Sequence, residues 1–249
     1  MYYYLVEQTV EWAQKKNQDK LKKLVGQYGI AGETVSPSPA RTVDELVTIG
    51  LEKNYSTFVG VGSDAFLNRV ASSLINQRGG VHGDRVVVGC IPVNFETDFA
   101  RWLGIKTIEQ AATMLKTRKI ANIAVGLIEP SKYFIAPLVI AQKKPFSLKL
   151  ITPQFELETQ AERITIDTNL AVVIQGPPRR QDLFHKLRYF FVGGPLAQTN
   201  NSQLFASRIK IETIDTLPVQ LGREIIAKTP ISLTLAPNAL QMIVEKAIM

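Results

Sequence analysis

A hydrophobic run that ends in an acidic residue is the first feature that could carry chemistry. Residues 58–68 read FVGVGSDAFLN, so a strand-like run ends in a glycine-containing turn and a helix-like run begins at once. Such a turn exposes backbone N–H groups at a helix N-terminus, where the helix dipole favours an anion. Asp64 would stand where its side chain can reach a metal ion, a phosphate-bound cation or a hydroxyl proton. The alternative is that Ser63 or Asp64 is only the N-cap of the helix, worth about 1 kcal/mol.

Two further segments place polar residues directly after strand-like runs. Residues 91–101 read IPVNFETDFAR. They follow a second strand, so their polar side chains are expected at the same sheet edge as Asp64, where open α/β sheets bind ligands. Alternatively, Asp98 and Arg101 are three residues apart and could pair on a helix surface. Residues 217–224 read LPVQLGRE, a strand that runs into a tight turn; the simpler reading of Glu224 is a solvated hairpin tip.

The segments before about Lys119 alternate between strands and helices. We predict strands at residues 2–6, 57–62 and 85–91, and helices at residues 7–28, 42–53, 64–76 and 107–117. Two capping boxes mark helix starts, one formed by Thr42 with Glu45 and one by Thr107 with Gln110. This alternation predicts a parallel sheet built from βαβ units.

The helix signal fades after Lys119, and short apolar strands separated by Pro, Gly and Asn follow. We predict strands at residues 120–128, 133–141, 146–151, 163–166, 171–174, 208–214, 217–221 and 231–235. Their spacing indicates an antiparallel sandwich or barrel. The change of pattern at residues 118–122 is the expected domain boundary.

The composition limits the classes of function. The chain has 249 residues, a net charge of +7 and a pI near 9.4. The positive excess suggests an anionic partner, or only a surface with more lysine than acid. One cysteine and two histidines exclude an internal disulfide or thiolate cluster and leave little for a histidine-rich metal site. No apolar run approaches the roughly 20 residues of a membrane span, and the first residues do not resemble a signal peptide, so we expect a cytoplasmic protein.

Taken together, the three segments resemble the catalytic domain of the diacylglycerol kinase family, which includes bacterial lipid kinases and sphingosine kinases. The family's G-G-D-G-T followed by L-N-E-V is similar to G-S-D-A-F followed by L-N-R-V at residues 62–70. The family's loop P-L-G-T-G-N-D-F-A-R-x-L-G-I is matched at Pro92 and at residues 98–105, which read DFARWLGI. The D-G-E turn of the family is echoed by G-R-E at residues 222–224. The order and spacing of these matches cover most of the chain.

The resemblance implies an α/β fold with an N-terminal Rossmann-like domain over residues 1–120 and a C-terminal antiparallel β-sandwich over residues 121–237. Residues 238–249 would return to the first domain. It also implies transfer of a phosphoryl group from ATP to a lipid hydroxyl, with Mg²⁺, in the cleft between the domains. In that reaction Asp64 would orient the substrate or metal, and Glu224 would accept the hydroxyl proton.

Further site residues follow from the same resemblance. The positions implied to bind the cofactor are Gly62, Ser63, Asn68, Asn94, Thr97 and Asp98. Asp182 is the candidate for a metal-linked acid in the second domain.

The sequence departs from the family pattern at the elements that face the phosphates. Ala65 and Phe66 replace the final Gly-Thr of the first motif, so Phe66 adds bulk and removes a hydroxyl. Glu96 lies in NFET, which replaces G-T-G-N, and brings a negative charge toward the expected phosphate position. The first strand is followed by EQTV at residues 7–10, in place of an N-P-x-S-G-like phosphate loop. Gly222 replaces the Asp of D-G-E.

We therefore expect a degenerate member of the family, with weak or absent ATP-dependent phosphorylation of a lipid hydroxyl. An active kinase with an altered phosphate loop is the alternative, because Asp64 and Glu224 are retained. A basic nucleic-acid-binding protein is the third reading, based on the lysines of residues 15–23, but no RNA-binding aromatic signature or helix-turn-helix pattern accompanies them. The expected partner is a lipid or an anionic membrane surface, with the protein bound at its periphery.

Overall fold

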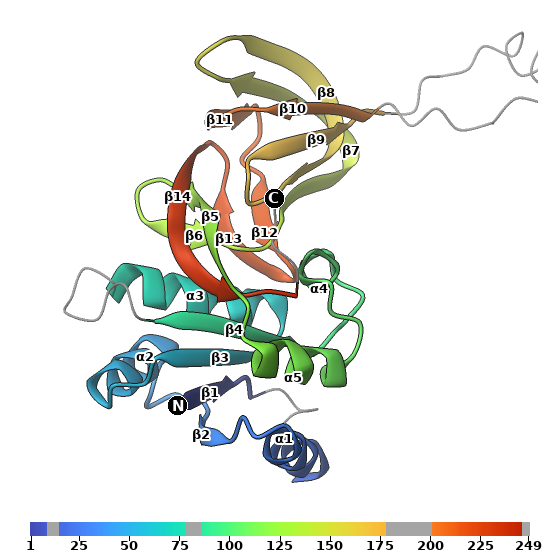
Figure 1. The fold of residues 1–249 in the computed structure, drawn as a ribbon. Coiled ribbons are helices and arrows are strands. Elements are labelled where there is room, and N and C mark those ends of the chain that lie inside the picture. The colour runs from blue at the N-terminus through green and yellow to red at the C-terminus, as the bar shows by residue number, and fades with distance from the viewer. Residues whose placement is uncertain (9–14, 78–85, 178–200, 246–249) are drawn as a thin grey trace, which may run out of the picture.

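The protein is seen in a computed structural model that describes residues 1–8, 15–77, 86–177 and 201–245. Helices and parallel strands from the first half of the chain form the lower part in Figure 1. Long curved strands from the second half form the upper part. The expected fold class, a parallel α/β region followed by antiparallel strands, is confirmed.

The lower part contains a parallel sheet in the order β2-β1-β3-β4. Its strands are β1 (Tyr2–Val6), β2 (Gly32–Val35), β3 (Thr57–Gly62) and β4 (Val87–Pro92). Every residue of β3 and β4 is buried, as the continuous apolar runs of a sheet covered on both faces require. The three central strands lie close to where the sequence predicts them, and β2 is an additional edge strand.

Five helices are described in the first half of the chain: α1 (Lys15–Gln27), α2 (Val43–Glu52), α3 (Asp64–Gln77), α4 (Asp98–Leu103) and α5 (Ile108–Thr117). The capping box before α2 is confirmed, because Thr42 and Glu45 bond each other's backbone N–H groups. The box before α5 is only half formed. Thr107 accepts from the N–H of Gln110, but the Gln110 side chain accepts from the N–H of Lys106.

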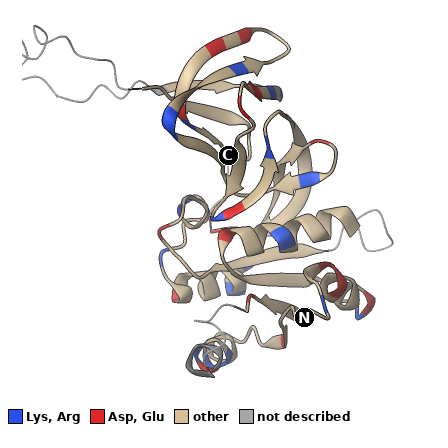
Figure 2. Cartoon of the chain, turned by 180° about the vertical axis from the view of Figure 1, so that it is seen from behind, with Lys and Arg blue, Asp and Glu red and all other residues tan. Residues whose placement is uncertain are grey.

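The first predicted helix, residues 7–28, begins too early. Glu7 still belongs to the β ladder, since its N–H donates to the carbonyl of Val61 at 2.8 Å. Residues 9–14 lie outside the described part of the chain. Within α1, Leu24 and Val25 are buried while Lys22 and Lys23 are exposed, so these lysines form a solvated face. Figure 2 shows Lys and Arg positions on both parts of the molecule, interspersed with Asp and Glu.

The second half consists of strands. They are β5 (Ile120–Ile128), β6 (Lys132–Phe134), β7 (Leu138–Ile151), β8 (Glu156–Ile166), β9 (Ala171–Gln175), β10 (Asn201–Phe205), β11 (Arg208–Thr213), β12 (Pro218–Leu221), β13 (Glu224–Lys228) and β14 (Ile231–Ile243). The prediction of one strand at 133–141 and another at 146–151 is wrong about where the first strand ends and the second begins. β6 ends at Phe134, and β7 runs through both predicted segments with an irregular register between Ala141 and Phe146.

The last strand joins the two parts. β14 pairs antiparallel with β5 and β11 and parallel with β4, where Met242 lies opposite Val88. The described strands therefore form one hydrogen-bonded sheet of 14 strands. None of the helices in the described ranges is long and apolar enough to cross a membrane.

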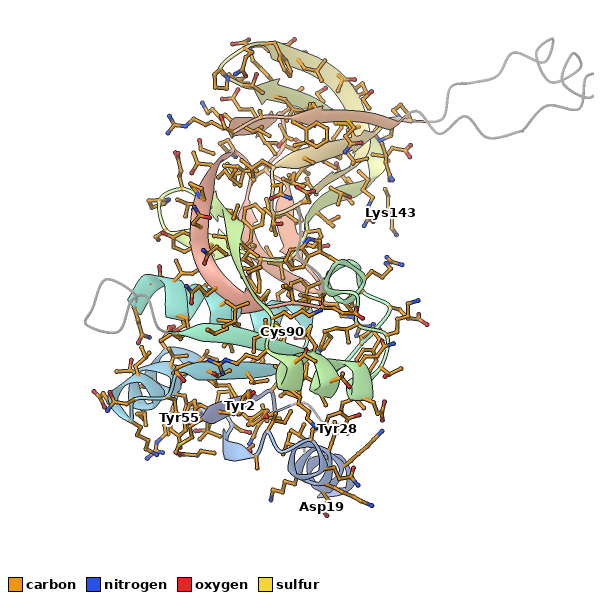
Figure 3. The ribbon with its side chains drawn as sticks, viewed as in Figure 1. Tyr2, Asp19, Tyr28, Tyr55, Cys90 and Lys143 are labelled. Carbon is orange, nitrogen blue, oxygen red and sulfur yellow. The ribbon has the colours of Figure 1, made fainter. Side chains whose placement is uncertain are left out.

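The core runs through the middle of the molecule, where the sole cysteine of the chain is located (Figure 3). Cys90 on β4 is 1% exposed. Burial, with a smaller contribution from the charge of Asp64, raises the pKa of its thiol. Cys90 is therefore a buried structural thiol rather than a nucleophile.

Candidate functional site

A cleft of about 1070 Å³ opens at the carboxyl ends of the parallel strands. Its walls are Glu7, residues 63–65, residues 93–97, Lys106 and residues 222–224. Glu7 follows β1, residues 63–65 follow β3, and residues 93–97 follow β4. Parallel strands end at one sheet edge, so three segments far apart in the sequence meet there.

The fourth wall comes from the antiparallel strands. The turn between β12 and β13 carries Gly222, whose φ of +60° is a left-handed conformation that glycine adopts without strain. A Cβ built on Gly222 would lie 3.7 Å from the Cβ of Asp64, so this turn contacts the start of α3. The structure thus brings the predicted residues Asp64 and Glu224 to the same cleft.

Asp64 connects two of the walls. Its Oδ1 accepts a hydrogen bond of 3.0 Å from the hydroxyl of Thr97. Thr97 is also the N-cap of α4, since its Oγ1 accepts from the N–H of Ala100. Asn94 and Thr97, both predicted cofactor ligands, line the cleft. Asp98 is the first residue of α4, and its side chain lies outside the described part of the structure.

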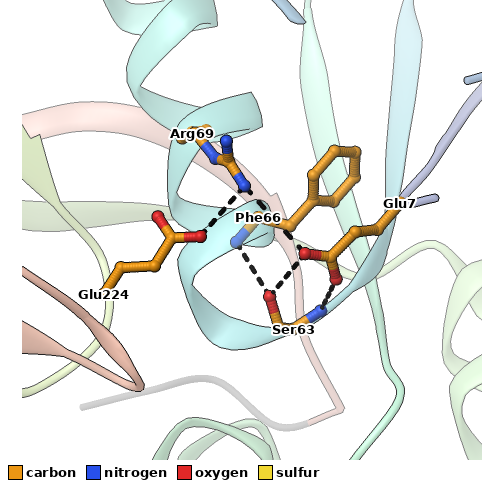
Figure 4. A network of polar contacts seen from close by, with 5 residues as sticks. All are labelled: Glu7, Ser63, Phe66, Arg69 and Glu224. Carbon is orange, nitrogen blue, oxygen red and sulfur yellow. Dashed lines mark hydrogen bonds and ion pairs between the residues drawn. The ribbon is translucent and has the colours of Figure 1, made fainter. Parts of the chain in front are cut away.

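Ser63 has two roles at the start of α3. Its Oγ accepts from the N–H of Phe66 at 3.3 Å, which is the expected N-cap contact. Its own N–H and hydroxyl both donate to the carboxylate of Glu7, at 2.6 and 2.9 Å. The backbone donor that the family resemblance assigns to phosphate therefore already binds an anion from the same chain (Figure 4).

Arg69 extends this network across the cleft edge. Its Nη2 lies 3.1 Å from Oε1 of Glu224 and 4.0 Å from Oε1 of Glu7. The guanidinium also lies 5.8 Å from the centroid of the Phe66 ring. Arg69 thus contacts a carboxylate from each part of the molecule (Figure 4).

Two of the sequence-predicted positions lie elsewhere. Phe66 is 1% exposed and is not part of the cleft wall, so its bulk does not fill the expected phosphate position. Asn68 is 7% exposed; its amide donates to the carbonyl of Tyr133 and accepts from the N–H of Ile135. Its side chain therefore joins α3 to the strand region around β6.

Gly62 lies at the buried end of β3, and its carbonyl accepts from the N–H of Val93. Asp182 lies outside the described residues.

Sequence reasoning did not include Glu7, Arg69 and Lys106 among the site residues. A signal existed for two of them. Glu7 follows its strand as directly as Asp64 follows the neighbouring one, and Arg69 replaces the acid of the family's L-N-E-V. Lys106 lies in the loop before α5 and carries no such motif.

The cleft wall is more acidic than basic. Its acids are Glu7, Asp64, Glu96 and Glu224, and its basic residues are Lys106 and Arg223. A nucleotide phosphate does not fit at Ser63 while Glu7 holds both of its donors. Across the described ranges, His, Cys, Asp and Glu side chains do not form a group of three or more that could hold a metal ion. The donors of Ser63 as they stand therefore do not match an open phosphate-binding turn.

Comparisons with known proteins support the fold. No family model matches the sequence, and no curated protein matches it. A solved structure of a "putative diacylglycerol kinase" from Bacillus anthracis str. Sterne is similar, with a TM-score of 0.74 and 13% sequence identity over 99% of this chain and 98% of that chain. A diacylglycerol kinase structure from the same organism has a TM-score of 0.69 and 15% identity over 100% and 98% of the two chains. The resemblance inferred from the motifs is thus confirmed for the fold.

Proposed function

We propose that this chain is a lipid-kinase-like protein with weak or absent ATP-dependent phosphorylation of a lipid hydroxyl. The full-length likeness to structures named as diacylglycerol kinases supports the lipid-kinase-like part of the proposal. The excess of acidic side chains in the cleft supports weak or absent phosphorylation, and the proposal depends mainly on this observation.

The cleft wall has four carboxylates and two cationic side chains, and Arg69 at its edge lies beside two of the carboxylates, so the site keeps a negative excess. ATP would bring several negative charges into this environment. Like charges about 4 Å apart repel by roughly 1 kcal/mol in water, and by more where water is excluded. Phosphoryl transfer depends chiefly on positioning the phosphates and neutralising their charge, so this balance opposes both binding and reaction.

The proton acceptor implied by the family resemblance is also engaged. Oε1 of Glu224 accepts from the guanidinium of Arg69 at 3.1 Å. A lipid hydroxyl would have to compete with a charge-assisted hydrogen bond for that oxygen. Arg69 thus engages one of the two oxygens of this carboxylate.

One observation favours the alternative of an active kinase with an altered phosphate loop. Asp64 and Glu224, the two residues to which the resemblance assigns the chemistry, both line the cleft. Only a measurement of turnover separates the two functions.

The test is labelled-ATP turnover with a panel of diacylglycerols and sphingoid lipids in mixed micelles. We expect lipid phosphorylation at, or only slightly above, the background of a matched Asp64→Asn variant. We also expect no thermal shift with Mg²⁺–ATP, whereas a ligand at 100 times its Kd would stabilise the fold by about 2.7 kcal/mol. Turnover by the wild type at about 1 s⁻¹ or faster, the usual range of kinases, that disappears in Asp64→Asn would establish the active kinase instead.

A further inference from the structure

The backbone of the chain directs Glu7 toward the start of α3. The N–H of Glu7 donates to the carbonyl of Val61 at 2.8 Å, which continues the β1–β3 ladder by one residue. The side chain then lies beside Gly62 and Ser63. A Cβ built on Gly62 would lie 2.8 Å from both Cβ and Oε2 of Glu7, so the carboxylate approaches through the space that the missing side chain leaves.

The contacts of this carboxylate are those of a bound anion. Its two oxygens accept from the N–H and the hydroxyl of Ser63, at 2.6 and 2.9 Å, directly before the first turn of α3. The Glu7 side chain is only 15% exposed, and the guanidinium of Arg69 lies 4.0 Å from it. A carboxylate that receives charge-assisted hydrogen bonds at the positive end of a helix dipole occupies a position that favours anions such as phosphate.

Glu96 provides the contrast within the same cleft. Its side chain also carries a negative charge in the wall, but the residue is exposed. Its backbone N–H donates to Oδ1 of Asn94, in a turn on another wall of the cleft. Glu96 contributes only its negative charge to the cleft, whereas the carboxylate of Glu7 accepts hydrogen bonds from the N–H and the hydroxyl of Ser63.

We propose that Glu7 is an internal anion that takes the place of a phosphate group in this cleft. The carboxylate excludes phosphate from Ser63, and its removal leaves the N–H and hydroxyl of Ser63 and the nearby Arg69 available to an external anion. The proposal rests on the proposed function only in taking this cleft as the counterpart of a lipid-kinase nucleotide cleft. It concerns anion binding, which is measured without turnover.

The experiment compares wild type with Glu7→Ala and Glu7→Gln. Isothermal titration with inorganic phosphate, at low ionic strength and without Mg²⁺, measures anion affinity directly. Glu96→Gln is the matched control, because it removes the same charge from the same cleft without touching Ser63. We expect Glu7→Ala to bind phosphate at least about tenfold more tightly than wild type, the effect of one charge-assisted hydrogen bond. Glu7→Gln should gain less, because its amide oxygen can still accept from Ser63. Glu96→Gln should show a smaller gain.

A site-specific measurement identifies where the anion binds. The backbone amide resonance of Ser63 in a ¹H–¹⁵N correlation spectrum should move in Glu7→Ala, because its hydrogen-bond acceptor is lost, and in Glu7→Gln, because a charged acceptor becomes a neutral one. It should move again on addition of phosphate to the variants, and should not respond in wild type. Glu7→Gln keeps the size of the side chain and provides the measurement if Glu7→Ala is unfolded.

Three results would overturn the proposal. Wild type could bind phosphate as tightly as the Glu7 variants, or folded Glu7 variants could show no gain. Glu96→Gln could also gain as much affinity as they do, which would reduce the effect to overall charge. The proposed function fails separately, through wild-type turnover at about 1 s⁻¹ or faster that depends on Asp64.

Discussion

Gly62 determines how closely two side chains can pack at the end of β3. A Cβ built on it would lie 2.7 Å from Cδ1 of Phe66 and 2.8 Å from Cβ of Glu7. Real Cβ atoms do not approach neighbours so closely, so any larger residue must displace one of these side chains. Because residue 62 has no side chain, both the buried ring of Phe66 and the carboxylate of Glu7 fit beside it.

Gly62→Ala should consequently destabilise the protein by about 1–3 kcal/mol, the usual effect of overpacking a tight site. Urea unfolding followed by circular dichroism measures the change. Gly26→Ala is the matched control, because a Cβ at that exposed helical position meets nothing within 4 Å. The control should be neutral or stabilising by about 0.5–1 kcal/mol. Equal effects of the two substitutions would contradict this account of Gly62.

At the scale of elements, α3 is the helix that connects the two parts of the molecule. Its first turn forms a wall of the cleft, and its next turn binds the end of β6 and the residue that follows it. Asn68 binds two backbone groups there, one through its amide nitrogen and one through its amide oxygen. The hydroxyl of Ser72 donates to the same carbonyl of Tyr133 at 2.9 Å.

Asn68→Leu should therefore cost about 1–3 kcal/mol of stability, because it leaves the buried N–H of Ile135 without its partner. Ser72→Ala is the comparison. The carbonyl of Tyr133 would keep its bond to Asn68, so the loss should be about 1 kcal/mol or less. Urea midpoints with unchanged slopes measure both values. A larger loss in Ser72→Ala than in Asn68→Leu would be inconsistent with this role of Asn68.

At the scale of the whole molecule, the two parts are joined by backbone and by side chains. β14 supplies the backbone connection, through its pairing with β4, β5 and β11. The ion pair of Arg69 on α3 with Glu224 on β13 crosses the cleft edge between the parts. Both partners are about half exposed, at 52% and 45%, so water and salt weaken the pair.

A double-mutant cycle with Arg69→Met and Glu224→Gln measures the strength of this contact. Met keeps an apolar side chain of similar length without the charge. We expect a coupling energy of about 0.2–1 kcal/mol at low salt that falls as salt is added. The pair Lys149–Glu156, which joins neighbouring strands within the antiparallel part, is the control cycle. An absence of coupling at low salt would mean that the contact does not help to hold the two parts together.

The local elements were largely predictable because their signals are local. β1, β3 and β5 have the predicted bounds. β1 and β3 are largely buried apolar runs, and β5 is a mainly apolar run that begins at the surface. The cap of α2 was predictable for the same reason, as Thr42 and Glu45 are only three residues apart. The start of α1 was not, because the backbone of Glu7 pairs with β3 rather than continuing the helical pattern.

The order of strands and helices, the change from parallel to antiparallel strands, and the positions of Asp64 and Glu224 at strand ends can all be read from local sequence patterns. Which side chains meet depends on how the strands are arranged in the sheet. Glu7 and Ser63 are 56 residues apart, and Arg69 and Glu224 are 155 residues apart. Such contacts depend on which strands become neighbours in the sheet, and residue spacing along the chain does not encode that order. The pairing of β1 with β3 therefore places the carboxylate of Glu7 at the start of α3, where it accepts hydrogen bonds from Ser63.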